Sequence, residues 1–509
     1  MSAARSRPTT LLVALTMGVT LMAQSASART TLPPVERYTL DNGLEVLLLP
    51  QRTNPFFECR FVARAGSASD PAGKEGLAQL TARMLTNGTP TMSEEELARA
   101  IEDMGATLAA SASLDTFAVQ GTAVTLDPSH RDRLLALFAD VLFNASFPEE
   151  SLAKTRALTL AGIKRLVDEH DDLADAAFAA ALYGDGPRGR MRSGTLASVP
   201  TLTRADLVGY RDRVLIPQHA VFAVAGDFDV DAMRTWISET LGRADWGKGI
   251  CEPGDLPGRC ARLVKGGEAL VNPFANRVGL RPAPAARAEG RRVVLVDRDD
   301  PSLNQVQWRL GQDNPVTLLA PSWAAFRLGT QILGGDFTAR LNMVLRVREG
   351  LTYGARFNVS YGAWDSGSMR VATYVAPKDV EKAIDLSLGE LEAVTSAPLP
   401  DTEVESFKAK INNGFPFKFE TISDTLEQYL YLAVDGVDVS WLETYTDRIA
   451  APTPAEVNAA LSVITPASMT LVAVGNRDLI PVLARYGKVE VVSATDFLES
   501  GLTHATAAE

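Results

Sequence analysis

Two stretches that lie far apart in this chain follow the same pattern, and this internal repeat restricts the folds open to the chain. Residues 216–229 read IPQHAVFAVAGDFD, and residues 465–478 read TPASMTLVAVGNRD. A proline, an apolar run, a glycine and a final aspartate occur in the same order and spacing in both. An apolar run of this length predicts a buried strand. Self-similarity at a long interval predicts a chain built from two homologous halves.

Helix starts also recur ahead of the repeated stretches. A capping box, in which a Ser or Thr is followed three residues later by an acceptor side chain, marks the N-terminus of a helix. Such boxes occur at 203–206 and 453–456, directly before the two repeats, and at 93–96 within the first half. The helix starts therefore support the same division of the chain.

The rest of each half alternates apolar strands with amphipathic helices in a matching order. Strands are predicted at 44–49, 117–126, 293–296 and 368–375, and helices at 76–87, 93–104 and 323–333. We therefore expect an α+β protein with two homologous domains, at 29–245 and 291–509. Residues 246–290, which are rich in Gly, Pro, Ala and Arg, are predicted to link them.

The linker contains two of the three cysteines. Cys251 and Cys260 flank a turn-rich segment, EPGDLPGR. In an oxidising compartment the two thiols can form a local disulfide, and the sequence leaves this pairing and two free thiols equally open. Cys59 lies in an apolar, strand-like stretch, so we expect it to be buried.

The N-terminal residues predict export from the cytoplasm. Arg5 and Arg7 precede an apolar run at 11–23, and Ala26-Ser27-Ala28 has the small residues of a cleavage site. This order is typical of a secretory signal peptide, here residues 1–28, and the run is too short for a permanent membrane span. We expect a secreted protein, in the periplasm of a Gram-negative bacterium.

The composition limits the partners. The formal net charge is -12, which argues against nucleic acid as a partner. Hydrophobic residues make up 46% and charged residues 22% of the chain, as in ordinary globular proteins, and no second apolar run is long enough to span a membrane.

Several motifs together resemble the insulinase-type (M16) peptidase family, in which two homologous domains, each a mainly antiparallel sheet with packed helices, are joined by a linker. The resemblance covers nearly all of the chain after the signal peptide. The motifs that carry it are Gly66–Ala78, Asn87–Thr89, Tyr183–Pro187 with Gly194-Thr195, Leu333–Leu341, and Leu345-Arg346 with Gly350–Tyr353.

Active members of that family carry the motif His-x-x-Glu-His, whose two histidines bind zinc and whose glutamate is the general base. Here Gln79 replaces the first histidine, Ala82 the glutamate and Arg83 the second histidine. The family's third ligand is a glutamate on a later helix, but residues 154–167 contain no Asp or Glu, and Gly162 is our predicted equivalent. We therefore expect no zinc in this chain.

No other set of residues in the sequence suggests a metal site. The histidines, at positions 130, 170, 219 and 504, are far apart in sequence. A lone histidine is more often a surface or satisfied core residue than a ligand, and the linker cysteines have no additional ligands beside them.

The second half retains the family's Arg/Tyr signature in Arg346 and Tyr353. The resemblance implies that Tyr353 hydrogen-bonds the developing oxyanion and that Arg346 binds substrate. The alternative is structural, with Arg346 capping a helix and Tyr353 packing at a strand start. Arg348 is a second candidate for the arginine role. Gly334 and Gly335 are either a helix stop or a substrate-facing turn.

These observations predict a non-catalytic subunit that pairs with a zinc-bearing M16 subunit. The pair would enclose unstructured peptides, and this chain would supply half of the chamber together with Arg346 and Tyr353. On its own the chain is expected to be inactive. The alternatives are a peptide-binding or structural scaffold of the same fold and, third, a peptidase that acts independently.

Overall fold

The structure is a computed structural model of the chain, and it describes residues 32–247, 290–362 and 366–507. The first half forms a six-stranded sheet in the order β1-β2-β6-β3-β5-β4. Only β2 and β6 pair in parallel. The strands are β1 (Glu36–Thr39), β2 (Glu45–Pro50), β3 (Phe56–Ala63), β4 (Thr107–Ala112), β5 (Phe117–Val124) and β6 (Ala220–Gly226).

The second half forms a seven-stranded sheet in the order β13-β12-β7-β11-β8-β10-β9. Here β7 pairs in parallel with both β11 and β12, and the other pairs are antiparallel. The strands are β7 (Val293–Asp297), β8 (Val306–Asn314), β9 (Ala355–Val359), β10 (Gly367–Val375), β11 (Thr470–Gly475), β12 (Val489–Ser493) and β13 (Thr506–Ala507).

The two repeated stretches contain equivalent strands, β6 and β11, which confirms the prediction of two homologous α+β domains. Each lies between a parallel neighbour, β2 or β7, and an antiparallel one, β3 or β8. The register also repeats: Arg60 lies opposite Ala223, and Arg309 lies opposite Val472, the counterpart of Ala223. The outer strands differ, because β1 reaches β2 through a hairpin whereas β12 arrives from the C-terminus.

Helices cover one face of each sheet and form its core. In the first half, the aromatic rings of Phe57, Phe61, Phe138 and Phe222 are fully buried between sheet and helices.

The predicted capping boxes at Ser93, Thr203 and Thr453 are all formed. The covering helices are α1 (Leu77–Met84), α2 (Glu94–Glu102), α3 (Pro128–Asn144), α6 (Arg204–Val214) and α7 (Val230–Leu241) in the first half. In the second half they include α8 (Trp323–Gly334), α9 (Arg340–Asn342), α10 (Val380–Ser396), α13 (Tyr445–Ala450), α14 (Pro454–Leu461) and α15 (Ile480–Leu483).

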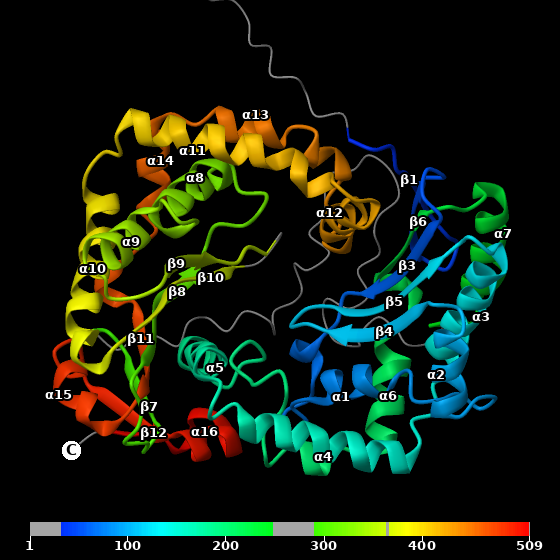
Figure 1. Cartoon of the computed structure of the whole chain (residues 1–509), viewed down its shortest axis with the longest axis horizontal. Helices are drawn as coiled ribbons and strands as arrows, with labels where there is room; N and C mark the ends of the chain where they lie inside the picture. Colours follow the sequence, from blue (N-terminus) through cyan, green and yellow to red (C-terminus); the bar gives the residue numbers. More distant parts are fainter. Residues whose placement is uncertain (1–31, 248–289, 363–365, 508–509) are drawn as a thin grey trace, which may run out of the picture.

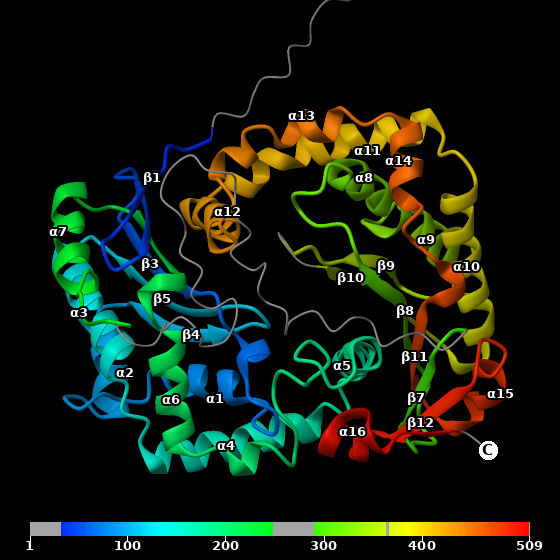
Figure 2. The same cartoon turned by 180° about the vertical axis from the view of Figure 1, so that it is seen from behind.

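The two halves exchange one helix each. Helix α4 (Glu149–Arg165) leads into α5 (His170–Tyr183), which packs on β7, β8 and β11 of the second half. Helix α11 (Asp401–Gly414) leads into α12 (Ile422–Val434), which packs on β3 and β6 of the first half. Figures 1 and 2 show α4 and α11 on opposite sides of the molecule, each carrying its successor to the other half. Helix α16 (Ala494–Ser500) lies beside α4.

Apolar side chains make the exchanged contacts. Leu173 and Phe178 of α5 share a buried cluster with Val294 and Val472 of the second sheet. On α12, the buried set of Leu426, Tyr429, Leu430 and Ala433 shares a cluster with Leu47, Val221 and Ala223 of the first sheet. Each sheet is therefore covered on its second face by a helix from the other half.

Ion pairs with a buried arginine accompany the apolar contact of α5. Arg309 of β8 is 1% exposed, and its Nε donates to Asp175 Oδ1 at 2.6 Å. Arg309 also donates to Asp171 Oδ1 at 2.5 Å, and Arg370 Nη2 donates to Asp175 Oδ2 at 2.7 Å. Burial opposes the charge of Asp175, but the guanidinium groups of Arg309 and Arg370 hold its pKa below the ordinary value.

The other exchanged helix makes an equivalent but weaker polar contact. Arg60, the repeat counterpart of Arg309, lies 3.9 Å from Glu427 of α12. Ser423 Oγ of α12 donates to Glu58 Oε2 at 2.6 Å. The two halves are thus joined by the same kind of contact at both exchanged helices.

Three predictions fall outside the described residues: the signal peptide at 1–28, most of the linker, and the pairing of Cys251 with Cys260. Cys59 is buried as expected, and burial raises the pKa of its thiol. Within the described ranges, no helix has both the length and the apolar composition to cross a membrane.

Candidate functional site

Helix α1 carries the positions that the family resemblance assigns to metal binding. It begins after Gly76, whose φ of 93° lies in the left-handed region, and Asp70 accepts hydrogen bonds from the backbone N–H groups of Gly76 and Ala78 at 3.0 and 2.9 Å. Burial raises the pKa of Asp70 to about 7, against the effect of these hydrogen bonds. The Gly66–Ala78 motif therefore forms the turn that starts α1.

The replaced metal positions make contacts within the protein. Gln79 Nε2 donates to the backbone oxygen of Ala112 at the end of β4, at 2.5 Å. Ala82 is buried. Arg83 Nη1 donates to Thr159 Oγ1 on α4 at 3.1 Å. Hydrogen bonds from Gln79 and Arg83 thus join α1 to its two neighbours, β4 and α4.

On α4, Thr159 and not Gly162 faces this turn of α1. Thr159 is buried and in contact with Arg83. A Cβ at Gly162 would meet no atom within 4 Å, so this position borders open space. The sequence prediction assigns Gly162 to the third-ligand position in a segment without Asp or Glu, whereas Thr159 is the α4 residue that contacts Arg83.

These side chains do not fit zinc. Gln79 offers a weak amide oxygen, Ala82 cannot accept a proton, and the guanidinium of Arg83 repels a cation. Thr159 already accepts a hydrogen bond from that guanidinium. Elsewhere in the described part of the chain, no three His, Cys, Asp or Glu side chains are grouped closely enough to hold a metal ion.

The structure brings Arg346 and Tyr353 together at one cavity. Both line a hollow of about 480 Å³, together with Asn304, Gln305 and Tyr374. The Tyr353 side chain is 81% exposed, so it does not pack at the start of a strand. The side chains of this signature are therefore available to a ligand.

The backbone explains why these two residues meet. Residues 343–348 form a π-helical turn, which ends where Gly350 adopts a φ of 65°. The N–H of Gly350 donates to the Arg346 oxygen at 3.1 Å, and that of Leu351 donates to the Leu345 oxygen at 2.8 Å. A left-handed glycine of this kind reverses the chain after a helix, which returns Tyr353 to the side of Arg346.

Arg346 is half-buried, and Phe337 holds it. Its guanidinium carbon lies 4.0 Å from the centre of the Phe337 ring. In such a cation–π contact the face of the guanidinium lies on the ring, so its N–H groups stay free to donate hydrogen bonds. Arg348, the alternative candidate, lies 3.7 Å from Glu349, which also pairs with Lys382 at 2.7 Å. Arg348 does not line the cavity. The geometry therefore favours Arg346 for contact with a ligand.

The glycine-rich turn has two different glycines. Gly334 is buried at the end of α8, and a Cβ there would lie 2.4 Å from the backbone nitrogen of Phe357 in β9. Only glycine permits this close approach. Gly335 is exposed. The turn is anchored to α11 by Lys410, which binds Asp336 Oδ2 at 2.5 Å.

The sequence reasoning missed an exposed apolar cluster beside the signature. Four of its side chains are unusually exposed for their type: Phe337, Met343, Val347 and Tyr353. Met343 and Val347 are four residues apart in the sequence. That spacing places two apolar side chains on one face of a helix, so it could have indicated an apolar surface. A group of exposed apolar side chains is typical of a binding surface.

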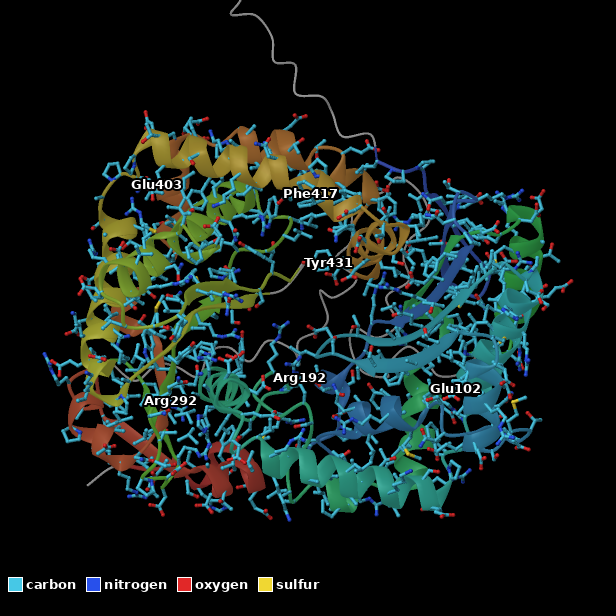
Figure 3. The ribbon with its side chains drawn as sticks, viewed as in Figure 1. Glu102, Arg192, Arg292, Glu403, Phe417 and Tyr431 are labelled. Carbon is cyan, nitrogen blue, oxygen red and sulfur yellow. The ribbon has the colours of Figure 1, made fainter. Side chains whose placement is uncertain are left out.

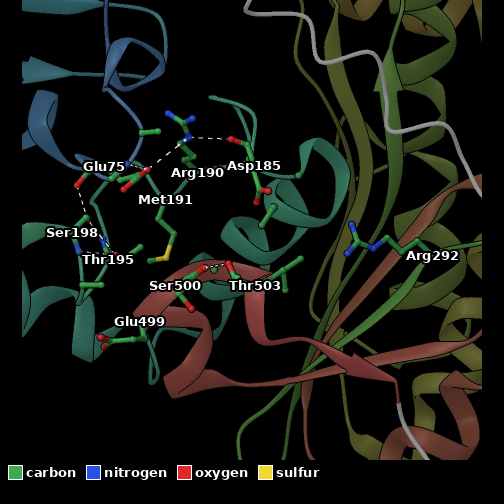
Figure 4. Close-up of a pocket in the computed structure, with 18 residues that line it drawn as sticks. Glu75, Asp185, Arg190, Met191, Thr195, Ser198, Arg292, Glu499, Ser500 and Thr503 are labelled. Carbon is green, nitrogen blue, oxygen red and sulfur yellow. Dashed lines mark hydrogen bonds and ion pairs between the residues drawn. The ribbon is translucent and has the colours of Figure 1, made fainter.

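A second site missed from the sequence lies between the halves. A cavity of about 650 Å³ is lined by Gln79, by α5 and the loop 184–193, and by Ser360, Ser368 and Arg370 of the second half. Figure 3 shows Arg192 between α1 and α5, beside the space that separates the halves. The same loop borders a cavity of about 640 Å³ towards α16, where Arg190 lies 3.8 Å from Glu75 (Figure 4).

Comparison with known proteins identifies relatives of both halves. Residues 45–196 match the family model described as insulinase (peptidase family M16), and residues 201–411 match that of the peptidase M16 inactive domain. An uncharacterized zinc protease of Mycobacterium tuberculosis is 27% identical over 365 residues, which cover 71% of this chain and 75% of that protein. An uncharacterized zinc protease of Streptomyces coelicolor is 24% identical, covering 84% of this chain and 86% of that one.

Solved structures share the fold. A peptidase M16 inactive domain from Pseudomonas fluorescens superposes with a TM-score of 0.72 at 23% identity, covering 87% of this chain and 98% of the other. A protease from Helicobacter pylori superposes with a TM-score of 0.69 at 17% identity, covering 87% and 100%. At these identities the similarity establishes the fold alone.

Proposed function

Because the chain belongs to the M16 peptidase family, we propose that it is the non-catalytic subunit of a secreted, heterodimeric zinc peptidase. One observation carries this proposal. Arg346 and Tyr353 line one open cavity, whereas the metal positions hold Gln79, Ala82 and Arg83, which do not bind zinc. The chain has lost one part of the family's chemistry and kept another, as expected of a subunit that depends on a partner.

The two retained side chains have distinct tasks in this proposal. The hydroxyl of Tyr353 donates a hydrogen bond to the substrate carbonyl oxygen as negative charge develops there. The guanidinium of Arg346, held on the ring of Phe337, binds substrate carbonyl or carboxylate oxygens through its free edge. The partner supplies the metal and the general base.

The exchanged helices support the role of a rigid chamber wall. Because α5 and α12 each cover the sheet of the other half, the halves hold a fixed relative position. The exposed Phe337, Met343 and Val347 offer apolar contact to an unstructured peptide or to the partner subunit.

The proposal includes export to the periplasm of a Gram-negative bacterium. The basic start, the apolar run at 11–23 and the small residues at 26–28 support it. N-terminal sequencing of the protein from its native host would test this part, because cleavage near residue 28 is expected.

The experiment that tests the function combines this chain with a zinc-bearing M16 relative from the same source. Proteolysis of an unstructured peptide is expected only from the mixture. Tyr353→Phe should lower kcat by roughly 100-fold, the loss typical of one oxyanion donor. Arg346→Ala should raise KM and lower kcat/KM.

Arg348→Ala is the matched control, because Arg348 is a neighbouring exposed arginine that pairs with Glu349 outside the cavity. It should leave turnover unchanged. Full activity of the mixture with both Arg346→Ala and Tyr353→Phe would contradict the proposed contribution to chemistry. It would instead favour a scaffold, a role that the exposed apolar cluster also suits.

A further inference from the structure

The cavity between the halves carries four arginine side chains, three of them from one short loop. Arg188, Arg190 and Arg192 alternate along the loop 184–193, and Arg370 comes from β10 of the second half. The loop runs through turns and bends, and all three of its arginines line the cavity.

Three of these groups are engaged within the protein. Arg370 binds Asp175 at 2.7 Å. Arg190 Nη1 donates to the backbone oxygen of Asp70 at 3.2 Å, and its Nε donates to that of Asp185 at 3.0 Å. Arg188 lies 3.8 Å from Asp115. These three arginines are held in place by the fold.

Arg192 differs from the other three. It is exposed, and no hydrogen bond or ion pair joins it to any other described residue. The lining holds two carboxylates: Asp175, which two arginines already bind, and Asp172, which is exposed on α5. The cavity thus has one uncommitted guanidinium, on a loop whose other two arginines lie 3.8 Å from Asp115 and Glu75.

We infer that this cavity binds a carboxylate of the peptide that the chamber encloses, and that Arg192 is the residue that holds it. A guanidinium binds a carboxylate through two parallel hydrogen bonds. The volume of about 650 Å³ suits a few residues of an extended peptide.

The position of Gln79 in the same lining adds a functional consequence. Gln79 occupies the first metal position of the family's helix, so the carboxylate would lie beside the half that has lost its metal. The first half of the chain would then bind the substrate and not hydrolyse it. The inference rests on the proposed function as a peptide-enclosing subunit, but its test needs only this chain.

The test measures binding of labelled, unstructured peptides to the isolated chain by fluorescence anisotropy. Three peptides share one neutral sequence: one has a free C-terminal carboxylate, one is amidated, and one is amidated with an internal Glu. At least one carboxylate peptide is expected to bind about tenfold more tightly than the neutral amide. Comparison of the two carboxylate peptides distinguishes the C-terminus from an acidic side chain.

Arg192→Gln is expected to remove this tenfold preference while leaving the neutral peptide unaffected. Arg192→Lys keeps the charge but loses the fork, so it should retain only part of the preference. Arg99→Gln is the matched control, because Arg99 is exposed on α2 outside the cavity. It should leave all three affinities unchanged.

Equal binding of the three peptides, no binding of any, or an Arg192→Gln variant that keeps the preference would each overturn the inference. So would an Arg192→Gln variant that binds peptides normally but fails to assemble with the zinc-bearing relative, because the cavity would then serve the partner. None of these results bears on Arg346 and Tyr353, whose role is decided by turnover of the mixed subunits.

Discussion

At the scale of single residues, the altered metal positions are integrated into the fold. Gln79 binds the end of β4, and Arg83 binds Thr159 on α4, so hydrogen bonds join the helix to both neighbours. The altered positions are therefore part of the packing of α1 against its neighbours.

Gly350 shows how much the retained signature depends on one backbone conformation. Its φ of 65° is unfavourable for any residue with a Cβ, so Gly350→Ala should destabilise the fold by about 1 kcal/mol. Gly354→Ala is the control, since Gly354 has no positive φ and a Cβ there meets nothing within 4 Å. Urea denaturation of both variants measures the difference. Equal stability of the two would show that the left-handed turn is not required.

At the scale of elements, the packing of α1 against α4 decides which position could complete a metal site. The spacing of Gln79 and Arg83 places both on one face of α1. Thr159 contacts that face through Arg83, whereas Gly162, about one turn further along α4, borders open space. The sequence could identify the helix but not which of its turns contacts α1.

Rebuilding the site tests this assignment. The variant with Gln79→His, Ala82→Glu, Arg83→His and Thr159→Glu is expected to bind zinc stoichiometrically, because it restores three ligands and the base around one helix turn. Replacing Thr159→Glu by Gly162→Glu in the same background should weaken zinc binding at least tenfold. Competition with a chromogenic chelator measures both affinities, and tighter zinc binding by the Gly162→Glu variant would contradict the assignment of Thr159.

At the scale of the whole molecule, the exchange of α5 and α12 makes each half depend on the other. Leu173 and Phe178 would be exposed to solvent if the first half were isolated, and its sheet would lose the cover of α12. Arg309 would likewise leave Asp171 and Asp175 unpaired. The two homologous domains are therefore expected to form one folding unit.

Expression of residues 32–247 alone tests this dependence. The fragment is expected to aggregate or to bind a hydrophobic dye strongly, and co-expression with residues 290–507 should restore a soluble complex. Size-exclusion chromatography and dye fluorescence measure both outcomes. A monomeric first half with native-like stability would show that the exchanged helices are dispensable.

The sequence by itself determined the features that depend on neighbouring residues. The apolar runs of the repeats specified β6 and β11, and hydroxyl–carboxylate spacing specified the capping boxes at Ser93, Thr203 and Thr453. The replacement of zinc ligands at Gln79, Ala82 and Arg83 is likewise a matter of side-chain chemistry, readable without a fold. Such signals act within a few turns, so no long-range contact is needed to interpret them.

Only the tertiary structure decided which distant surfaces meet. Nothing local distinguishes α5, whose apolar face would suit either sheet, from a helix that stays in its own half. The contact of Thr159 with Arg83 and the gathering of four arginines between the halves follow from how distant elements pack. These arrangements depend on the packing of the whole molecule, because apolar contact is nondirectional and becomes specific only when both surfaces are in place.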